Sequence, residues 1–251
     1  TTEIYTLSLH DALPISGMPN GADPQITRIQ PRRPRGLKVL IHLSEGEPFE
    51  VMLEALEKSQ LWPGDTLTAK KKHQLIELDE TVRVRDAALN LLSYSARTRT
   101  ELSRRLRQKG FHHARIVPCL DRLEERGFLD DRAVAEAFIR DRLRHRPRGR
   151  SRLRSELRAK GVDAETVQGA IEKVFEDEKV TDLTLADQVA RGWVTRQGTK
   201  ILDALHSDDR DVRNKARRRL HGYMGRRGFG GAALSEAMRI ATELAKESAD
   251  G

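Results

Sequence analysis

The chain is poor in the residues that build disulfide scaffolds, stack nucleic-acid bases or cross membranes. It has a single cysteine among 251 residues, Cys119, so no internal disulfide can form. This usage is common in the reducing cytoplasm, where we expect the protein to act. Aromatic residues make up only 4% of the chain, too few for a base-stacking sheet. Because no apolar run approaches the roughly 20 residues that span a bilayer, we expect no membrane partner either.

Motifs for catalysis or metal binding are also lacking. The sequence contains no phosphate-binding loop, nucleophile motif or zinc signature. His112 and His113 are adjacent in an expected turn, which is a poor spacing for metal ligands. The glycine-rich stretch from Gly228 to Gly231 lies where one expected helix gives way to the next. We therefore expect a protein that is not an enzyme, with no metal and no cofactor.

Positive charge is abundant and unevenly distributed. The chain carries 46 Lys and Arg against 38 Asp and Glu, with a net charge of +8 and an isoelectric point near 9.8. Residues 81–160 alone hold 22 basic and 10 acidic residues, so the rest of the chain is net acidic. Such a local excess favours a polyanionic partner, either nucleic acid or an acidic protein surface.

One pattern of apolar residues and glycine recurs three times with identical gaps. Its copies are Leu102, Leu106, Gly110, Phe111, Ile116, Leu120 and Leu123; Leu153, Leu157, Gly161, Val162, Val167, Ile171 and Val174; and Leu220, Met224, Gly228, Phe229, Leu234, Met238 and Ala241. Apolar residues four apart share one helix face, and a glycine four residues later is typical of a left-handed helix stop. Each copy predicts a helix, a glycine turn and a second helix, and tandem copies predict a stacked array.

A further helical segment precedes each pair, so the sequence predicts a mostly α fold with a tandem array of three three-helix repeats. The expected leading helices are 83–94, 132–145 and 183–197. Thr98 and Glu101 form a capping box, and Asp130 or Asp131 caps the leading helix of the second repeat. The expected repeats cover residues 81–130, 131–178 and 179–251, and the third carries a polar insertion near 199–211.

A small N-terminal α+β module with a β-hairpin is expected over residues 18–80. Strand patterns occupy residues 26–29, 37–43 and 49–51, and residues 52–61 look helical. Gly64-Asp65 opens another helix toward Leu75. Residues 1–17 contain a stretch, Ser8 to Ile15, that resembles a translated sequencing adapter, so we expect a non-native tail there.

The strongest chemical feature is a run of arginines at alternate positions. It comprises Arg140, Arg142, Arg144, Arg146, Arg148, Arg150, Arg152 and Arg154. Pro147 and Gly149 place a turn in its middle, so the run wraps a helix–turn–helix corner. Within residues 140–158 only Asp141 and Glu156 offset this charge. Like charges repel, which favours an external anion over a merely solvated basic surface.

Two smaller basic patches precede the glycine stops of the first and third repeats. Cations there are also favoured by the helix dipole, so the dipole alone could explain them. The candidate partner-binding residues are Arg104, Arg105, Arg107, Lys109, Arg142, Arg144, Arg146, Arg148, Arg150, Arg152, Arg154, Arg158, Lys160, Arg226 and Arg227.

Several segments of the first two repeats together carry a family signature. They are Gly127-Phe128-Leu129-Asp130-Asp131, followed by Ala135, Phe138, Arg142 and Gly149; Leu153-Arg154-Ser155-Glu156-Leu157-Arg158-Ala159-Lys160-Gly161; Glu101-Leu102-Ser103-Arg104-Arg105-Leu106; and residues 88–94. They resemble the RecX family of bacterial recombination regulators over roughly residues 26–245, more weakly in the third repeat. The resemblance implies a helical array that lies in the groove of the RecA nucleoprotein filament and bridges neighbouring protomers. It further implies slower filament growth, ATP hydrolysis and strand exchange, weak DNA binding, and no catalytic site to carry over.

Two functions remain in competition at this point. The first is a monomeric RecA-binding regulator of recombination, DNA repair and the SOS response. The second is a free-standing DNA- or RNA-binding protein built of helix-turn-helix-like repeats. Salt separates them in part, because six to ten phosphate contacts alone should weaken roughly 10³-fold or more between about 50 and 200 mM salt.

Overall fold

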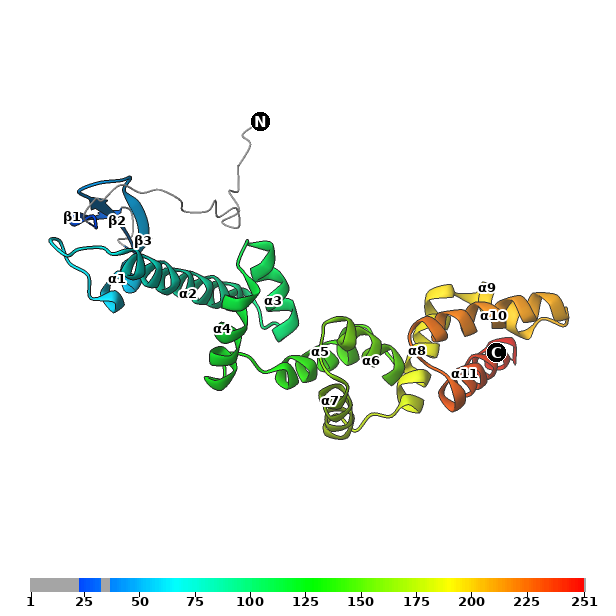
Figure 1. Cartoon of the computed structure of the whole chain (residues 1–251). Coiled ribbons are helices and arrows are strands. Elements are labelled where there is room, and N and C mark those ends of the chain that lie inside the picture. The colour runs from blue at the N-terminus through cyan, green and yellow to red at the C-terminus, as the bar shows by residue number, and fades with distance from the viewer. Residues whose placement is uncertain (1–22, 33–36, 251) are drawn as a thin grey trace, which may run out of the picture. The chain divides into compact units, whose positions relative to one another are not determined.

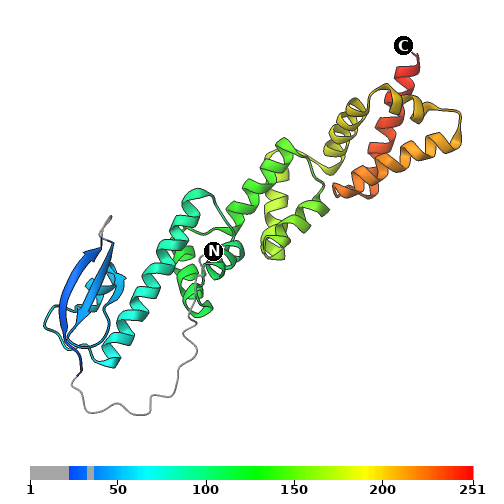
Figure 2. The same cartoon turned by 90° about the horizontal axis from the view of Figure 1, so that it is seen from above.

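The computed structural model describes residues 23–32 and 37–250, which are coloured in Figures 1 and 2. Residues 1–17, where the sequence predicts a non-native tail, lie outside the described residues. The chain divides into two compact units, the first ending at Arg85 and the second beginning at Asp86. The first unit contains the β-sheet, and the second contains the helical repeats.

Three antiparallel strands form the sheet in the order β1-β2-β3, which confirms the predicted hairpin and adds β1 to it. The strands are β1 (Ile26–Arg32), β2 (Lys38–Leu43) and β3 (Phe49–Met52). One face of the sheet packs with the helix α1 (Leu53–Ser59) and the segment that follows it. The core of this unit comprises Ile26, Val39, Ile41, Val51, Ala55, Leu56, Leu61, Leu67, Leu75 and Val82.

The helix α2 (Ala69–Tyr94) runs without interruption for 26 residues, so the prediction of two separate helices here is wrong. Residues 69–94 contain no glycine or proline that could stop it. Within the first unit, Asp79 accepts a hydrogen bond from the backbone N–H of Met52 at 2.6 Å. Arg85 binds Glu54 with both guanidinium nitrogens, at 2.5 and 2.6 Å, and this pairing, together with Lys58, lowers the pKa of Glu54 to about 2.

The second unit is entirely helical in its regular structure and confirms the three three-helix repeats. Its helices after α2 are α3 (Arg99–Gln108), α4 (His113–Glu125), α5 (Asp131–His145), α6 (Arg150–Ala159), α7 (Ala164–Asp177), α8 (Asp182–Gln197), α9 (Thr199–His206), α10 (Arg210–Arg226) and α11 (Gly231–Asp250). The leading helices are the end of α2, α5 and α8. The middle helices are α3, α6 and α10, and each ends at one of the repeated glycines.

The predicted helix ends are where the sequence places them. Gly110, Gly161 and Gly228 all have positive φ, at 89°, 84° and 85°, as a left-handed helix stop requires. Thr98 and Glu101 form the capping box at the start of α3. Asp130 caps α5 by accepting a hydrogen bond from the N–H of Ala133 at 2.8 Å, so Asp131 is free for another contact.

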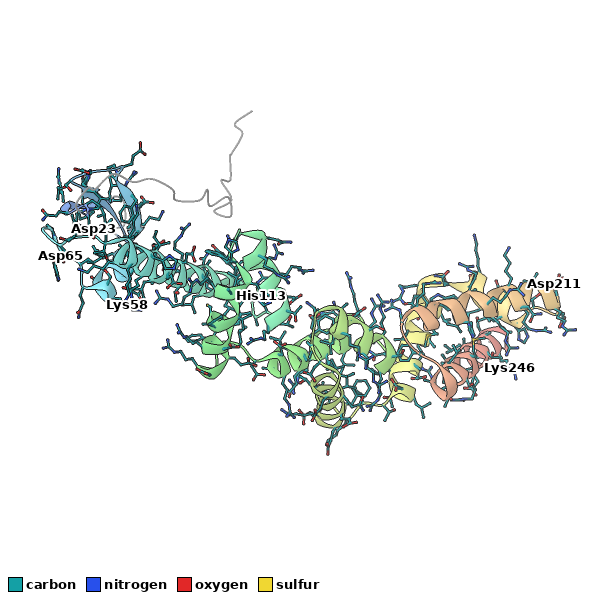
Figure 3. The ribbon with its side chains drawn as sticks, in the orientation of Figure 1. Asp23, Lys58, Asp65, His113, Asp211 and Lys246 are labelled. Carbon is teal, nitrogen blue, oxygen red and sulfur yellow. The ribbon has the colours of Figure 1, made fainter. Side chains whose placement is uncertain are left out.

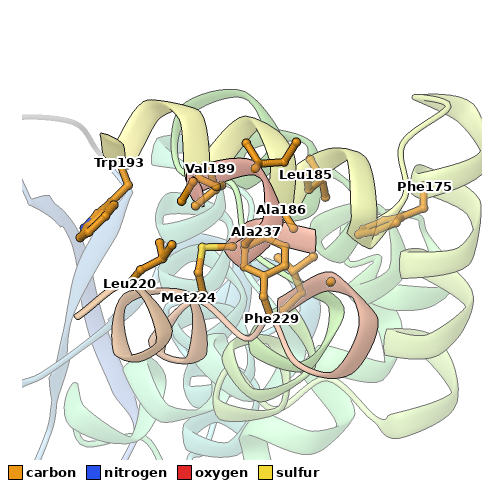
Figure 4. Packing of buried hydrophobic residues seen from close by; sticks show 14 of the residues in the cluster. Phe175, Leu185, Ala186, Val189, Trp193, Leu220, Met224, Phe229 and Ala237 are labelled. Atoms are coloured by element: carbon orange, nitrogen blue, oxygen red, sulfur yellow. The ribbon is translucent and has the colours of Figure 1, made fainter. Parts of the chain in front are cut away.

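The repeated apolar positions are buried in the first two repeats, apart from the half-buried Phe111, and are partly displaced in the third. Leu220, Met224 and Phe229 lie in the third-repeat core, with Trp193 beside them (Figure 4). On α11, however, Ala233 and Ala237 are buried, whereas Leu234 and Met238 are only partly covered. Of the three positions predicted to be buried on α11, Ala241 is fully buried, whereas Leu234 and Met238 are only partly buried.

The insertion predicted near residues 199–211 explains this displacement. It is not a polar loop, because it forms the helix α9 and the first turn of α10. Ile201 and Leu205 on α9 are buried against the third-repeat core, and α9 packs on α11 as well as on α10. Since α11 is covered by α8 and α9 together, its buried face turns toward both.

Neighbouring repeats are joined by hydrogen bonds between helix ends. At the first joint, the Thr98 hydroxyl donates to the carbonyl of Lys160 at 2.6 Å, and the N–H of Arg99 donates to Asp131 at 2.7 Å. The end of the middle helix of one repeat thus sits on the start of the middle helix of the repeat before it. We call this set of bonds a repeat joint.

The second joint uses the equivalent residues, 51 or 67 positions further along the chain. The N–H of Gly149 donates to the carbonyl of Arg227 at 2.9 Å, and the N–H of Arg150 donates to Asp182 at 3.2 Å. A Cβ on Gly149 would lie 2.4 Å from the carbonyl oxygen of Gly228. The Gly149–Arg227 bond of the second joint therefore runs from backbone to backbone, at an approach that only glycine permits.

Gly161→Ala should destabilise the second repeat more than Gly110→Ala destabilises the first. Both substitutions meet the left-handed strain of about 1–2 kcal/mol. The new Cβ at position 161 would also lie 2.3 Å from Thr100 across the joint, whereas a Cβ at position 110 meets nothing within 4 Å. Overpacking adds about 1–3 kcal/mol. Hydrogen exchange of α5–α7 and α3–α4 measures the two losses, and equal losses would show that the joint does not require Gly161.

Candidate partner-binding surface

The structure divides the fifteen candidate cations into two groups. Eight are exposed and form no side-chain hydrogen bond or ion pair within the described part of the chain: Arg104, Arg105, Arg107, Lys109, Arg144, Arg146, Arg158 and Arg226. The other seven make contacts inside the second unit: Arg142, Arg148, Arg150, Arg152, Arg154, Lys160 and Arg227. Only the first group can offer its whole charge to a partner.

Glu156 on α6 holds three arginines of the second group. The Nε atoms of Arg152, Arg142 and Arg148 lie 2.7, 3.3 and 4.0 Å from its carboxylate oxygens. The Arg142 guanidinium also lies 4.2 Å from the ring centroid of Phe138, where a cation–π contact is favourable. We call Glu156 and these three arginines the Glu156 cluster. One carboxylate therefore holds three of the eight arginines of the alternating run.

Burial and neighbouring charges shift the pKa values of the Glu156 cluster in opposite directions. Burial acts to raise the pKa of the Glu156 carboxyl, but hydrogen bonds from Arg152 and Arg142 outweigh it and hold that pKa below its ordinary value. Burial lowers the pKa of Arg148, and the approach of Arg227 adds to this effect against the pull of Glu156. The Nε atom of Arg148 is buried without a hydrogen-bond partner in the described structure. The cluster thus retains surplus positive charge.

The repeat joints take up further cations that the sequence leaves unpaired. Lys160 binds Glu101 at 2.7 Å across the first joint. Arg150 lies 3.4 Å from Asp182 and 4.1 Å from the ring centroid of Phe175 at the second. Counting charge only within residues 140–158 misses these carboxylates, because they lie 59 and 32 residues away along the chain. The shared 51-residue offset of the joints is the signal that could have revealed Asp182.

Two members of the second group make neutral contacts. Arg154 donates two hydrogen bonds to the side-chain oxygen of Gln168, at 3.1 and 3.0 Å. Arg227 donates to the carbonyl of Pro147 at 3.5 Å and lies 4.5 Å from the ring centroid of Tyr223. The Pro147 contact places Arg146 and Arg226 at the same joint, since each is the chain neighbour of a contacting residue.

We call the eight exposed cations of the first group the free cations. Some of them recur at the end of every middle helix. Each lies just before the glycine that ends its helix: Arg107 and Lys109 before Gly110, Arg158 before Gly161, and Arg226 before Gly228. All four side chains are exposed. Because the joints place each middle helix on the next, these cations form a repeated feature of the array. Arg144 and Arg146 add to it at the end of α5.

Other kinds of site are not found in the described part of the chain. Across residues 23–32 and 37–250, no three His, Cys, Asp or Glu side chains gather into a group that could hold a metal ion. His113, labelled in Figure 3, begins α4 and is exposed. None of the helices described is both long and apolar enough to cross a membrane.

Comparison with known proteins identifies the repeats. Residues 85–123 match the family model described as RecX, first three-helix domain, and residues 130–171 match RecX, second three-helix domain. The regulatory protein RecX of Mycolicibacterium vanbaalenii is 35% identical over 175 residues, which cover 68% of this chain and 90% of that protein. This chain belongs to the RecX family.

More distant relatives extend the match along the chain. The regulatory protein RecX of Clostridium botulinum is 24% identical over 218 residues, covering 86% of this chain and 96% of that protein. A crystal structure of regulatory protein RecX superposes with a TM-score of 0.64 at 20% identity, over 86% of this chain and 98% of the other. Since the identity is low, this likeness shows a shared RecX fold.

Glu156→Gln should destabilise the second unit by about 1–3 kcal/mol at neutral pH, because three guanidinium groups lose their shared anion. The depressed pKa of Glu156 gives stability that is present above the unfolded pKa of about 4.3 and is lost as pH falls through the folded pKa. Thermal unfolding of the variant and the parent should therefore converge as the pH falls below the lowered pKa of Glu156 in the folded protein.

Asp141→Asn is the matched control. Asp141 also binds Arg142, at 2.7 Å, but its side chain is 53% exposed, so its loss should cost less than about 0.5 kcal/mol. Equal losses for the two substitutions would contradict the central role of Glu156.

Proposed function

We propose that this chain binds the RecA recombinase and its nucleoprotein filament, and that it inhibits filament growth and ATP hydrolysis. The observation that supports this most is the recurrence of exposed, unpaired cations before the glycine stop of each repeat. A filament presents the same surface at regular intervals, so an array with regularly placed cations suits it. Membership of the RecX family supports the same partner.

In this proposal, the protein acts by binding and carries out no catalysis of its own. It is a monomer of the cytoplasm that modulates recombination, DNA repair and the SOS response, and it needs no cofactor. It binds single- or double-stranded DNA weakly through phosphates. The free cations, rather than the Glu156 cluster, make the contacts with acidic patches on RecA, because the clustered arginines already have internal partners.

Free-standing nucleic-acid binding is the alternative, and the same free cations favour it. A helix-turn-helix reader would discriminate between duplex sequences through side chains in the major groove. A filament regulator has no need of such discrimination. Docking to a protein groove also buries apolar surface, so its affinity should fall less steeply with salt than phosphate binding does.

RecA ATP hydrolysis on single-stranded DNA tests the proposal directly. Titration with this protein at physiological salt should inhibit hydrolysis well below one copy per RecA, because one array contacts several protomers. An equal amount of an unrelated basic protein serves as the control. Absence of inhibition, combined with steeply salt-dependent DNA binding, would reject RecA regulation in favour of nucleic-acid binding.

Charge reversal should locate the contact surface. The double variant Arg144→Glu, Arg146→Glu should weaken inhibition at least about tenfold, since buried interfacial charge pairs contribute about 2 kcal/mol or more. Both side chains are exposed without internal partners, so the melting temperature should stay nearly unchanged. Arg122→Glu, Arg126→Glu makes the same change at exposed positions on and after α4. Equal loss in both variants would mean that overall charge, not the corner between α5 and α6, drives binding.

A further inference from the structure

The groove between α9 and α10 has no counterpart in the first two repeats. There the leading helix is followed directly by the middle helix, whereas α9 intervenes between α8 and α10. The middle helix is also longer, with 17 residues in α10 against 10 in both α3 and α6. Where α9 and α10 lie together, with Gln197 of α8 at one side, they line an open groove with a cavity volume of about 280 Å³.

The floor of this groove is apolar. Ile201 and Ala204 line it from α9, and Val212 and Ala216 line it from α10. Ile201 and Ala216 are each only 3% exposed, but Val212 remains 42% exposed. An aliphatic side chain that lies open beside a cavity leaves apolar surface in water, which a bound apolar group would cover.

The rim of the groove is cationic. Lys200, Lys215 and Arg219 all line it and all are exposed. Arg219 donates a hydrogen bond to the side-chain oxygen of Gln197 at 3.0 Å, while the two lysines have no such partner within the described residues. None of the described side chains that line the groove is acidic. Asp211, labelled in Figure 3, opens α10 but is outside the lining.

We propose that the α9–α10 groove binds an acidic peptide segment of a partner protein that inserts one aliphatic or aromatic side chain. The cavity is below the size of most small-molecule sites and suits a single side chain. An apolar anchor ringed by charge pairs is a common arrangement at protein interfaces. The proposal stands apart from RecA inhibition, since it concerns a surface outside the candidate cations.

Nucleic acid is the less suitable occupant. Strands that bind without sequence preference stack their bases on aromatic side chains, and none of the side chains that line the groove is aromatic. Phosphates would use the cationic rim but gain nothing from the aliphatic floor. An acidic peptide with one apolar residue uses both.

Fluorescence anisotropy with the full chain tests this choice. The probe is a labelled peptide, Gly-Asp-Glu-Leu-Glu-Asp-Gly, and its control has serine in place of leucine. The leucine peptide should bind about tenfold more tightly, as expected for burial of one leucine side chain. Lys215→Glu, Arg219→Glu should lower its affinity at least about tenfold. Arg217→Glu, Arg218→Glu changes the same charge on the same helix outside the groove and should lower it less than about threefold.

Each contrary result is decisive. Failure of the leucine peptide to bind at about 1 mM protein, or equal binding of the two peptides, overturns the proposal. So does a labelled oligothymidylate strand that binds as tightly as the peptide with the same response to the variants. If the rim variant unfolds, Val212→Ser replaces it, because this exposed change should weaken only the leucine peptide. No RecA is present, so the result is independent of the ATPase measurement.

Discussion

The second unit depends on the hydrogen bonds that join the end of one middle helix to the start of the one before it. A helix leaves N–H groups unpaired at its start and carbonyls unpaired at its end. At both joints the unpaired carbonyl at one helix end finds a donor at another helix start: the Thr98 hydroxyl donates to Lys160 at the first, and the Gly149 N–H donates to Arg227 at the second. The bonds that terminate each repeat therefore also fix its register against the next.

This arrangement decides which cations are available to a partner. Because a middle helix ends at a joint, the basic residues near its end lie close to the start of another helix and to the acidic residues there. Lys160, at the end of α6, binds Glu101 for this reason, and Arg150, at the start of α6, binds Asp182 at the start of α8. The cations one turn away have no such neighbour. The array thus neutralises part of its charge internally and presents the rest at repeated positions.

The helices of the first two repeats, the glycine stops and the three-stranded sheet could be predicted from the sequence because their signals are local, whereas the continuity of α2 and the existence of α9 were missed. The glycine spacing, the capping box at Thr98 and the alternation of Val39 and Ile41 each act within a few residues. The pairing of Lys160 with Glu101 and of Arg150 with Asp182 could not be predicted in this way, since these carboxylates lie 59 and 32 residues away along the chain. The buried face of α11 was also out of reach. It depends on α9, whose apolar residues Ile201 and Leu205 look like part of a polar insertion.

The third repeat departs from the first two at the start of its middle helix. The residue equivalent to Thr98 and Gly149 is Ala216, which lies inside α10 and is 3% exposed. Its N–H is bonded within the helix, because α10 begins six residues earlier, at Arg210. In the first two repeats, the start of the middle helix accepts the neighbouring repeat. On α10 the equivalent position lies inside the helix and cannot accept a neighbour in the same way. A fourth repeat could not attach to α10 by the same joint. The surface of the extended α10 is consequently free to acquire a binding role of its own, separate from the contacts that hold the repeats together.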